Sequence, residues 1–265
     1  MKQQTIKHGF TLKGIGLHSG HPTEIAVAPA PADTGLIFIV AGQKVPATID
    51  SLTETRRGTT LKGVAVVEHF QSAAAGLNID NLEIFVTGTE IPIADGSALP
   101  FAQALTKAGL VQQAAERHYF DLKEEIKLSD KGATLEARPY HGFKVEFMVK
   151  FEGFREQSLV FDPDSQSYLE EIAPARTFGY LEEAEALKRQ GLALGASLEN
   201  ALVLDKNGYV NQPRFPDELV RHKILDLIGD LALLGRPLRA SLKARGSGHK
   251  LNTDLVRLLT EASGG

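Results

Sequence analysis

The sequence predicts an α+β protein made of two similar halves, each with several strands and about two helices. Alternating apolar segments of strand length occur in both halves, and so do longer stretches with the apolar spacing of a helix. The polar segment QQAAERH (112–118) separates the two sets. We therefore expect an N-terminal α+β domain over residues 1–113 and a C-terminal α+β domain over residues 118–265, although no fixed-period sequence repeat relates them.

Strand-like and helix-like segments alternate along the N-terminal half. The glycine-rich stretch KGIGLHSG interrupts an alternating pattern and predicts the turn of a hairpin. A run of alanines before Gly76 predicts a helix that ends near this glycine, and Ser97 lies near the start of a second helix. The expected elements are a hairpin over 5–27, a strand over 36–40, a helix over 66–79, a strand over 81–88 and a helix over 95–110.

The C-terminal half begins with strands and ends with helices. Pro216 suits the first turn of its longest apolar helix, and Gly235 suits the stop of that helix. The stretch RGSGHKLN (245–252) predicts a glycine-flanked loop. The other expected elements are strands over 119–129, 133–140, 143–151 and 158–162, a helix over 181–191, a strand over 201–205, and helices over 218–235 and 252–262.

Composition limits the class of protein. The chain has 265 residues, 43% hydrophobic and 23% charged, as is ordinary for a globular protein. A net charge of −4 gives no general attraction to nucleic acid or anionic membranes, and the lack of cysteine excludes disulfides, thiolate zinc sites and a cysteine nucleophile. The N-terminus has no signal-peptide pattern, and no apolar run is long enough to span a membrane. We expect a cytoplasmic monomer with neither a nucleic-acid partner nor stable membrane insertion.

Three polar residues stand out in the apolar helix ELVRHKILDLIGDLALLG (218–235). His222, Asp226 and Asp230 follow one another at intervals of four, so they form one stripe on the helix. A solvated face is one interpretation of this stripe. A buried carboxylate, in contrast, needs a cation, a donor or a metal as its partner, and His and Asp at this spacing can reach the same ion.

Two further segments could supply partners for the stripe. Glu68 and His69 are adjacent in an otherwise apolar helix, and His249 lies beside Gly248 in RGSGHKLN. Surface positions are the alternative for both segments. Two histidines and one aspartate leave a fourth metal position open for water, as catalytic zinc sites do, and a neighbouring carboxylate can take a proton from that water. The HExxH motif of common metalloproteases is absent.

Motifs along the whole chain resemble one family. They are GIGLHSG, VVEHF, EIPIADGSALPF, ARTFGY, GLALGASLENALVL, ELVRHKILDLIGDLALLG and GHKLN, in order from about residue 5 to 260. This set resembles UDP-3-O-acyl-N-acetylglucosamine deacetylase, the zinc amidohydrolase family of lipid A biosynthesis. The resemblance implies two α+β domains packed through their helical layers, with the active site at the interface. It also implies acetamide hydrolysis of the UDP-sugar, with release of acetate.

The resemblance further implies a metal set and a base. His69, His222 and Asp226 match the zinc ligands, and Glu68 matches the general base. The same ligand set could also hold iron(II). Residues 181–204 match the insert that forms the acyl-chain passage, although their leucines and small residues are equally normal in a packed core.

Five other residues take roles from the same resemblance. His249 matches a cationic histidine near the leaving group, and Asp230 matches the acid that supports it. Thr177 matches the hydroxyl that steadies the oxyanion. Lys223 matches a lysine that faces the sugar-phosphate part of the substrate, and Phe178 a side chain that lines the cleft. The leaving amine would take its proton from His249 or from the base.

The chain departs from the family pattern in places. Val66 stands where the family commonly has threonine, so polar support of the metal site could be missing there. Residues 41–62 read differently from better-known members, and no role is carried over to them. Two alternative functions are a non-catalytic relative that binds a UDP-sugar or acyl ligand, and a deacetylase of another amide. The intact Glu68 argues against the first, because binding alone needs no base.

Overall fold

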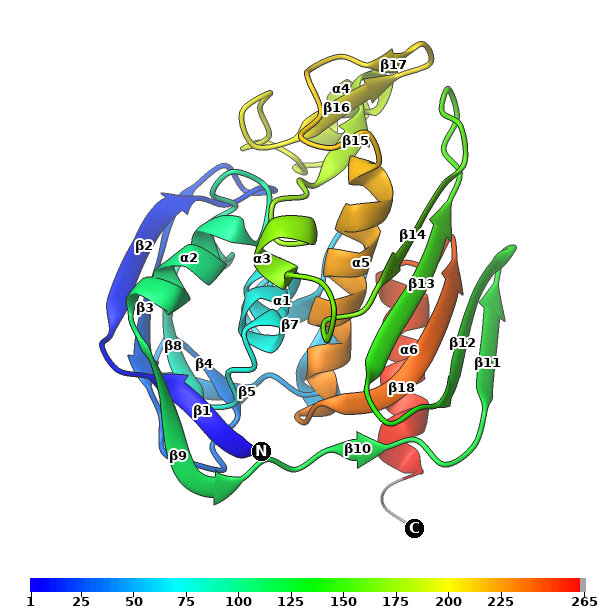
Figure 1. Cartoon of the computed structure of the whole chain (residues 1–265). Coiled ribbons are helices and arrows are strands. Elements are labelled where there is room, and N and C mark those ends of the chain that lie inside the picture. Colours follow the sequence, from blue (N-terminus) through cyan, green and yellow to red (C-terminus); the bar gives the residue numbers. More distant parts are fainter. Residues whose placement is uncertain (263–265) are drawn as a thin grey trace.

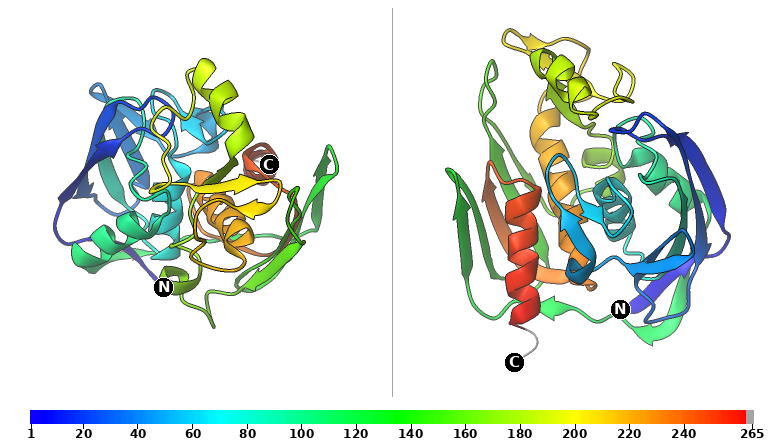
Figure 2. Two further views of the ribbon diagram at one scale, coloured as in Figure 1. Left: turned by 90° about the horizontal axis from the view of Figure 1, so that it is seen from above. Right: turned by 180° about the vertical axis from the view of Figure 1, so that it is seen from behind.

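Two β-sheets form the outer layers of the molecule, and helices fill the space between them (Figure 1). This computed structural model describes residues 1–262, so residues 263–265 of the expected C-terminal domain lie outside the described residues. Sheets and helices occur in both halves, which confirms the predicted α+β class. A view from above shows the helical layers of the two halves facing each other (Figure 2).

The sheet of the N-terminal half has five strands in the order β2-β3-β8-β4-β5. Its central strand β8 (Leu82–Thr87) pairs antiparallel with β3 and parallel with β4. The strands predicted around the turn KGIGLHSG, and at 36–40 and 81–88, are confirmed. The other members are β2 (Phe10–Ile15), β3 (Pro22–Pro29), β4 (Leu36–Val40) and β5 (Gln43–Pro46).

The sheet of the C-terminal half repeats this topology in the order β11-β12-β18-β13-β14. Its central strand β18 (Leu238–Arg245) again pairs antiparallel on one side, with β12, and parallel on the other, with β13. Each half therefore places a late strand between two earlier hairpins, although no sequence repeat is visible. The other members are β11 (Ile126–Asp130), β12 (Ala133–Pro139), β13 (Phe143–Val149) and β14 (Gln157–Phe161).

Each half adds one helix before its central strand and one after it. These are α1 (Glu68–Gly76) and α2 (Leu99–Lys107) in the first half, and α5 (Glu218–Leu231) and α6 (His249–Glu261) in the second. The pair that precede the central strands, α1 and α5, pack against each other at the centre of the molecule. All residues of α5 are buried except Arg221 and Lys223, so the prediction of a helix buried on most of its circumference is confirmed.

The contact between α1 and α5 is unusually close at Gly229. A Cβ atom at this position would lie 2.1 Å from the carbonyl oxygen of Glu68, which no side chain can occupy. The glycine therefore lets the backbones of the two helices touch. This contact brings the start of α1 beside the middle turns of α5.

Two features of the sheets were not predicted from the sequence. The strand β18 was not predicted, although Leu238, Ala240, Leu242 and Ala244 alternate with polar residues and are buried. Most of the polar segment 112–118, expected to be a boundary, is strand β9 (Leu110–Glu116), which pairs with β1 (Lys2–Ile6). Apolar content is low in β9 because most of its residues lie at an exposed edge.

Two further segments differ from expectation. The strand predicted over 119–129 is broken: β10 (Phe120–Asp121) pairs with β18, and β11 begins only at Ile126. The expected loop RGSGHKLN ends in helix, because α6 begins at His249 with Gly248 as its extended N-terminal cap. His249 is thus held by regular backbone hydrogen bonding instead of by a loop.

Each half carries an insertion just before its central helix. In the first half it holds η1 (Ile49–Ser51), β6 (Leu52–Glu54) and β7 (Thr60–Leu61). In the second half it holds α3 (Tyr168–Glu171), β15 (Phe178–Tyr180), α4 (Leu181–Arg189), β16 (Leu202–Asp205) and β17 (Gly208–Tyr209). The last four of these lie over the start of α5 (Figure 1). The helix predicted at 181–191 and the strand predicted at 201–205 are α4 and β16. Among residues 1–262, no helix has the length and apolar character needed to cross a membrane.

Candidate active site

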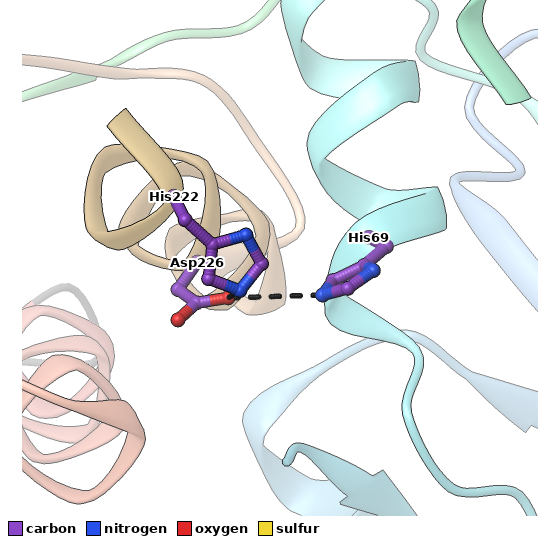
Figure 3. A group of neighbouring side chains, drawn as sticks. All are labelled: His69, His222 and Asp226. Atoms are coloured by element: carbon purple, nitrogen blue, oxygen red, sulfur yellow. Dashed lines mark ion pairs between the residues drawn. The ribbon is translucent and has the colours of Figure 1, made fainter. Parts of the chain in front are cut away.

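Three of the predicted site residues meet between α1 and α5. His69 comes from the first turn of α1, and His222 and Asp226 come from successive turns of α5 (Figure 3). All three are at least 97% buried, and one nitrogen or oxygen atom from each lies within 4.8 Å of the others. Within the part of the chain that the structure describes, this is the one group of such residues close enough to share a metal ion.

The donor atoms in this group face one another as a metal site requires. His222 Nδ1 donates to the carbonyl oxygen of Ala175 at 3.1 Å, which leaves a lone pair on His222 Nε2. That lone pair faces Asp226 Oδ1 at 3.3 Å, and His69 Nε2 lies 3.9 Å from the same oxygen. Asp226 Oδ1 is buried and has no hydrogen-bond partner. Acceptors gathered in this way are stabilised by a cation, so the three residues fit a divalent metal.

The protonation states also suit metal binding. Burial and the neighbouring His222 lower the pKa of His69 to about 3, and burial lowers the pKa of His222. Both rings are therefore neutral near pH 7. Burial opposes the charge of Asp226, but the basic groups around it, led by His222 and Lys223, hold its pKa well below the usual range. Two neutral imidazoles and one carboxylate result.

The metal-facing ring of His69 has less polar support than that of His222. His69 Nδ1 is buried without a hydrogen-bond partner. Val66, which precedes the motif, lies in the left-handed region with φ of 60° and packs with Leu17 and Ile93. Its apolar side chain offers no hydrogen bond to the His69 ring.

Glu68 lies beside the metal group at the start of α1. Its side chain is 4% exposed and lines a cavity of about 270 Å³ together with the three possible ligands. Burial raises the pKa of Glu68 to about 7, with His249 opposing this shift and Asp226 and Asp230 adding to it. A carboxylate with this pKa can accept a proton near neutral pH.

His249 and Asp230 form a pair on the other side of the cavity. His249 Nδ1 donates to Asp230 Oδ2 at 2.9 Å, and Asp230 is fully buried behind the ring. His249 Nε2 lies 4.0 Å from Glu68 Oε1 and 3.9 Å from Asp226 Oδ2. Burial opposes the charged ring, but Asp230, Asp226 and Glu68 outweigh burial and raise the pKa of His249 to about 9. His249 is therefore an imidazolium at neutral pH, in position to donate a proton into the cavity.

Thr177, Phe178 and Lys223 line the same cavity. Thr177 is fixed by its backbone, whose N–H donates to Gly96 O at 2.7 Å. The Phe178 ring packs edge-on against His222, with 5.7 Å between ring centroids. Lys223 Nζ donates a short hydrogen bond to Asp226 Oδ2 and lies 5.7 Å from the centroid of Phe178. The cavity thus brings together the predicted site residues, with Asp230 immediately behind it.

Two residues near the site were not singled out by sequence. Thr59, in the insertion before α1, is fully buried between Glu68 and Asp230. Arg176 binds the buried carboxylate of Glu218 at 2.9 Å and so ties the segment that carries Thr177 to the start of α5. The ARTF motif contains Arg176, but nothing in the spacing of residues 41–62 points to Thr59.

The expected acyl-passage insert, residues 181–204, contacts the rim of this cavity in its middle part. The backbone N–H groups of Leu194 and Gly195 donate to the carbonyl oxygens of His18 and Leu17, and Leu17 lines the cavity. Leu194 is 49% exposed and Leu198 is 56% exposed. These leucines are not buried in a core, so core packing does not account for them.

Comparisons with known proteins identify the family. A family model described as UDP-3-O-acyl N-acetylglycosamine deacetylase matches residues 3–261. A UDP-3-O-acyl-N-acetylglucosamine deacetylase of Coxiella burnetii is 42% identical over 273 aligned positions, which cover 98% of this chain and 90% of the relative. Proteins of the same name from Chromobacterium violaceum and Psychrobacter arcticus are 41% and 42% identical, covering 98% and 97% of this chain and 90% and 85% of the relatives. The chain belongs to the UDP-3-O-acyl N-acetylglycosamine deacetylase family.

Proposed function

We propose that this protein hydrolyses the acetamide of UDP-3-O-acyl-N-acetylglucosamine in lipid A biosynthesis, and that zinc is its metal. Family membership supports the reaction. The observation that carries the mechanism is the unpartnered, buried Asp226 Oδ1 facing two histidine nitrogens, with Glu68 and His249 on the same cavity. Iron(II) would suit the same ligands, so metal content decides between the two ions.

His69, His222 and Asp226 would hold the ion from two different helices. When bound there, a divalent ion supplies a Lewis acid that acidifies water and polarises a carbonyl oxygen. Glu68 takes a proton from the attacking water, whose oxygen adds to the acetyl carbon. Its pKa of about 7 places it close to the operating pH of such a base.

His249 and Thr177 act on the other atoms of the acetamide. The charge of His249 and the hydroxyl of Thr177 stabilise the negative oxygen that forms on the acetyl group. His249 then gives its Nε2 proton to the amine nitrogen as the carbon–nitrogen bond breaks. The products are acetate and a free glucosamine amine, and the proton that Glu68 removed balances the one that His249 gave.

The rest of the substrate would lie along both sides of the cavity. We assign the acyl chain to residues 181–204, because Leu194 and Leu198 are about half exposed and the Gly195 backbone is bound to Leu17 at the cavity rim. Phe178 would line the cleft, and Lys223, whose side chain is 17% exposed, would face the sugar-phosphate part.

Acetate release tests this proposal directly. We expect the metal-loaded protein to release one acetate and one free amine per molecule of UDP-3-O-acyl-GlcNAc, with much slower release from UDP-GlcNAc, which lacks the acyl chain. Bound zinc and iron are measured in the same preparation. Metal-loaded protein that binds the acylated substrate and releases no acetate would identify a binding protein instead. Equal rates with and without the acyl chain would assign the activity to another amide.

The pH dependence of the rate should change when Asp230 is replaced by asparagine. The wild-type rate should fall below about pH 7 as Glu68 becomes protonated, and fall above about pH 9 as His249 loses its proton. Asp230→Asn keeps the shape but removes a charge that raises the pKa of His249. The basic limb should therefore move to lower pH, and the rate at pH 8 should drop more than the rate at pH 6.

A control separates this effect from a structural one. Asp254→Asn changes a partly exposed carboxylate on α6 that binds Lys250, and it should leave both limbs in place. If Asp230→Asn lowers the thermal stability and leaves the shape of the pH profile unchanged, Asp230 only supports the fold.

A further inference from the structure

Every polar group of Thr59 is hydrogen-bonded at the active site. Its N–H donates to Glu68 Oε2 at 3.0 Å, and its carbonyl oxygen accepts from the N–H of Val67 at 3.2 Å. Its hydroxyl donates a short hydrogen bond to Asp230 Oδ1. The residue is fully buried, so water does not compete for these bonds. One side chain and its backbone thus hold carboxylates from both halves of the molecule.

The backbone before Thr59 is shaped to fit around Glu68. Arg57 and Gly58 both have positive φ, 66° and 148°. A Cβ atom at Gly58 would lie 3.0 Å from Glu68 Oε1, closer than a side chain normally packs. A turn of this kind costs conformational free energy, which the contacts at its end must offset. The turn delivers the Thr59 N–H to Glu68 Oε2 and leaves Oε1 toward His249.

Asp230 is held from two sides. Asn252 Nδ2 of α6 donates to Asp230 Oδ2 at 2.9 Å, and Ser247 in turn holds Asn252 through a hydrogen bond of 2.6 Å. These bonds come from the C-terminal half, as does the His249 bond to Oδ2. The Thr59 hydroxyl comes from the N-terminal half and binds the other oxygen, Oδ1. The orientation of the Asp230 carboxylate, and therefore that of the His249 ring, depends on the hydrogen bonds from both halves.

We propose that Thr59 is a positioning residue for catalysis, which holds the Asp230–His249 pair in register with Glu68 across the two halves. Glu68 belongs to α1 and His249 to α6, and their reactive atoms lie 4.0 Å apart. Proton transfer depends on sub-ångström placement of such groups. Thr59 binds Glu68 directly and binds Asp230, the support of His249, without lining the cavity, so it acts through these residues and not on the substrate.

The test compares Thr59→Val with Thr59→Ser. Valine keeps the shape and the N–H but removes the hydroxyl, and serine keeps the hydroxyl and removes one methyl group. Since the lost bond has a charged acceptor, we expect Thr59→Val to lower kcat roughly tenfold to a hundredfold. KM and metal content per chain should stay unchanged, and Thr59→Ser should retain most of the wild-type kcat. Thr60→Val, at the partly exposed neighbouring residue, is the matched control and should leave kcat unchanged.

A double-mutant cycle shows whether Thr59 acts through Asp230. Thr59→Val should cost less than about threefold in kcat when it is added to Asp230→Asn, because the bond it removes is already weakened. A residue with a merely structural role would give the same factor in both backgrounds. If circular dichroism shows that Thr59→Val does not fold, Thr59→Ala takes its place in the cycle.

This inference rests on the proposed deacetylation, and the two fail in different ways. Absence of acetate release by the wild-type protein would overturn the proposed function itself. Wild-type activity with an unchanged kcat for Thr59→Val would overturn only the role of Thr59. The role of Thr59 would also be overturned if Thr59→Ser loses as much kcat as Thr59→Val. It would equally be overturned if the loss of kcat in Thr59→Val is fully additive with that in Asp230→Asn.

Discussion

Glu68→Gln should lower kcat by roughly 10² to 10⁴ while the protein still binds metal and substrate. The amide has the shape of the carboxylate and can still accept the Thr59 N–H, but it cannot take a proton from water. Glu68 is not one of the three possible metal ligands, so bound metal should stay at the wild-type level. The measurements are kcat and KM for acetate release, and metal content per chain.

Glu83→Gln is a suitable control for this variant. Glu83 lies on the outer sheet of the same half and binds Lys44 at 2.9 Å, away from the cavity. The kcat of Glu83→Gln should match that of the wild-type protein. Near-normal turnover by Glu68→Gln would assign the base to another group. A large loss of metal in Glu68→Gln would mean that Glu68 helps to bind the metal and does not act in proton transfer.

Removal of the metal should abolish turnover. A strong chelator should bring the rate to background, and about one equivalent of zinc should restore it. His69→Ala, His222→Ala and Asp226→Ala should each lower the metal bound per chain, because each removes one of three ligands. Full turnover by protein freed of metal would contradict the proposed mechanism.

His141→Ala controls for the loss of any histidine. His141 is exposed in the turn between β12 and β13, so its removal should change neither metal content nor rate. A comparison of Glu68→Gln with Asp226→Ala is also informative. The first should be inactive with metal bound, and the second inactive with metal lost.

The proximity of the two possible ligands on α5 was predictable because its geometry is local. A helix fixes the relative direction of His222 and Asp226 whatever the rest of the chain does, and the apolar residues around them indicate burial. The approach of His69 to this pair is not local. It depends on how α1 packs against α5, so motif resemblance was needed to connect them.

Thr59 shows where prediction from sequence stops. Its role comes from a turn with two positive φ angles and from contact with a helix far along the chain. Neither property leaves a periodic pattern in the residues. The strand β18 is a different case, because Leu238, Ala240, Leu242 and Ala244 alternate as a buried strand should, and this signal was present.

The glycine contact between α1 and α5 affects how the metal is gained and lost. Gly229 sets the spacing of two helices that carry the three possible metal ligands from distant parts of the chain, and it does so by backbone contact alone. The loss of chain entropy on bringing His69 to Asp226 is therefore compensated by the hydrophobic core, not by coordination bonds. Small zinc domains, by comparison, unfold when their ion is removed. Here the empty and loaded proteins should share one folded state, so the ion can exchange with its cellular pool without exposing the core.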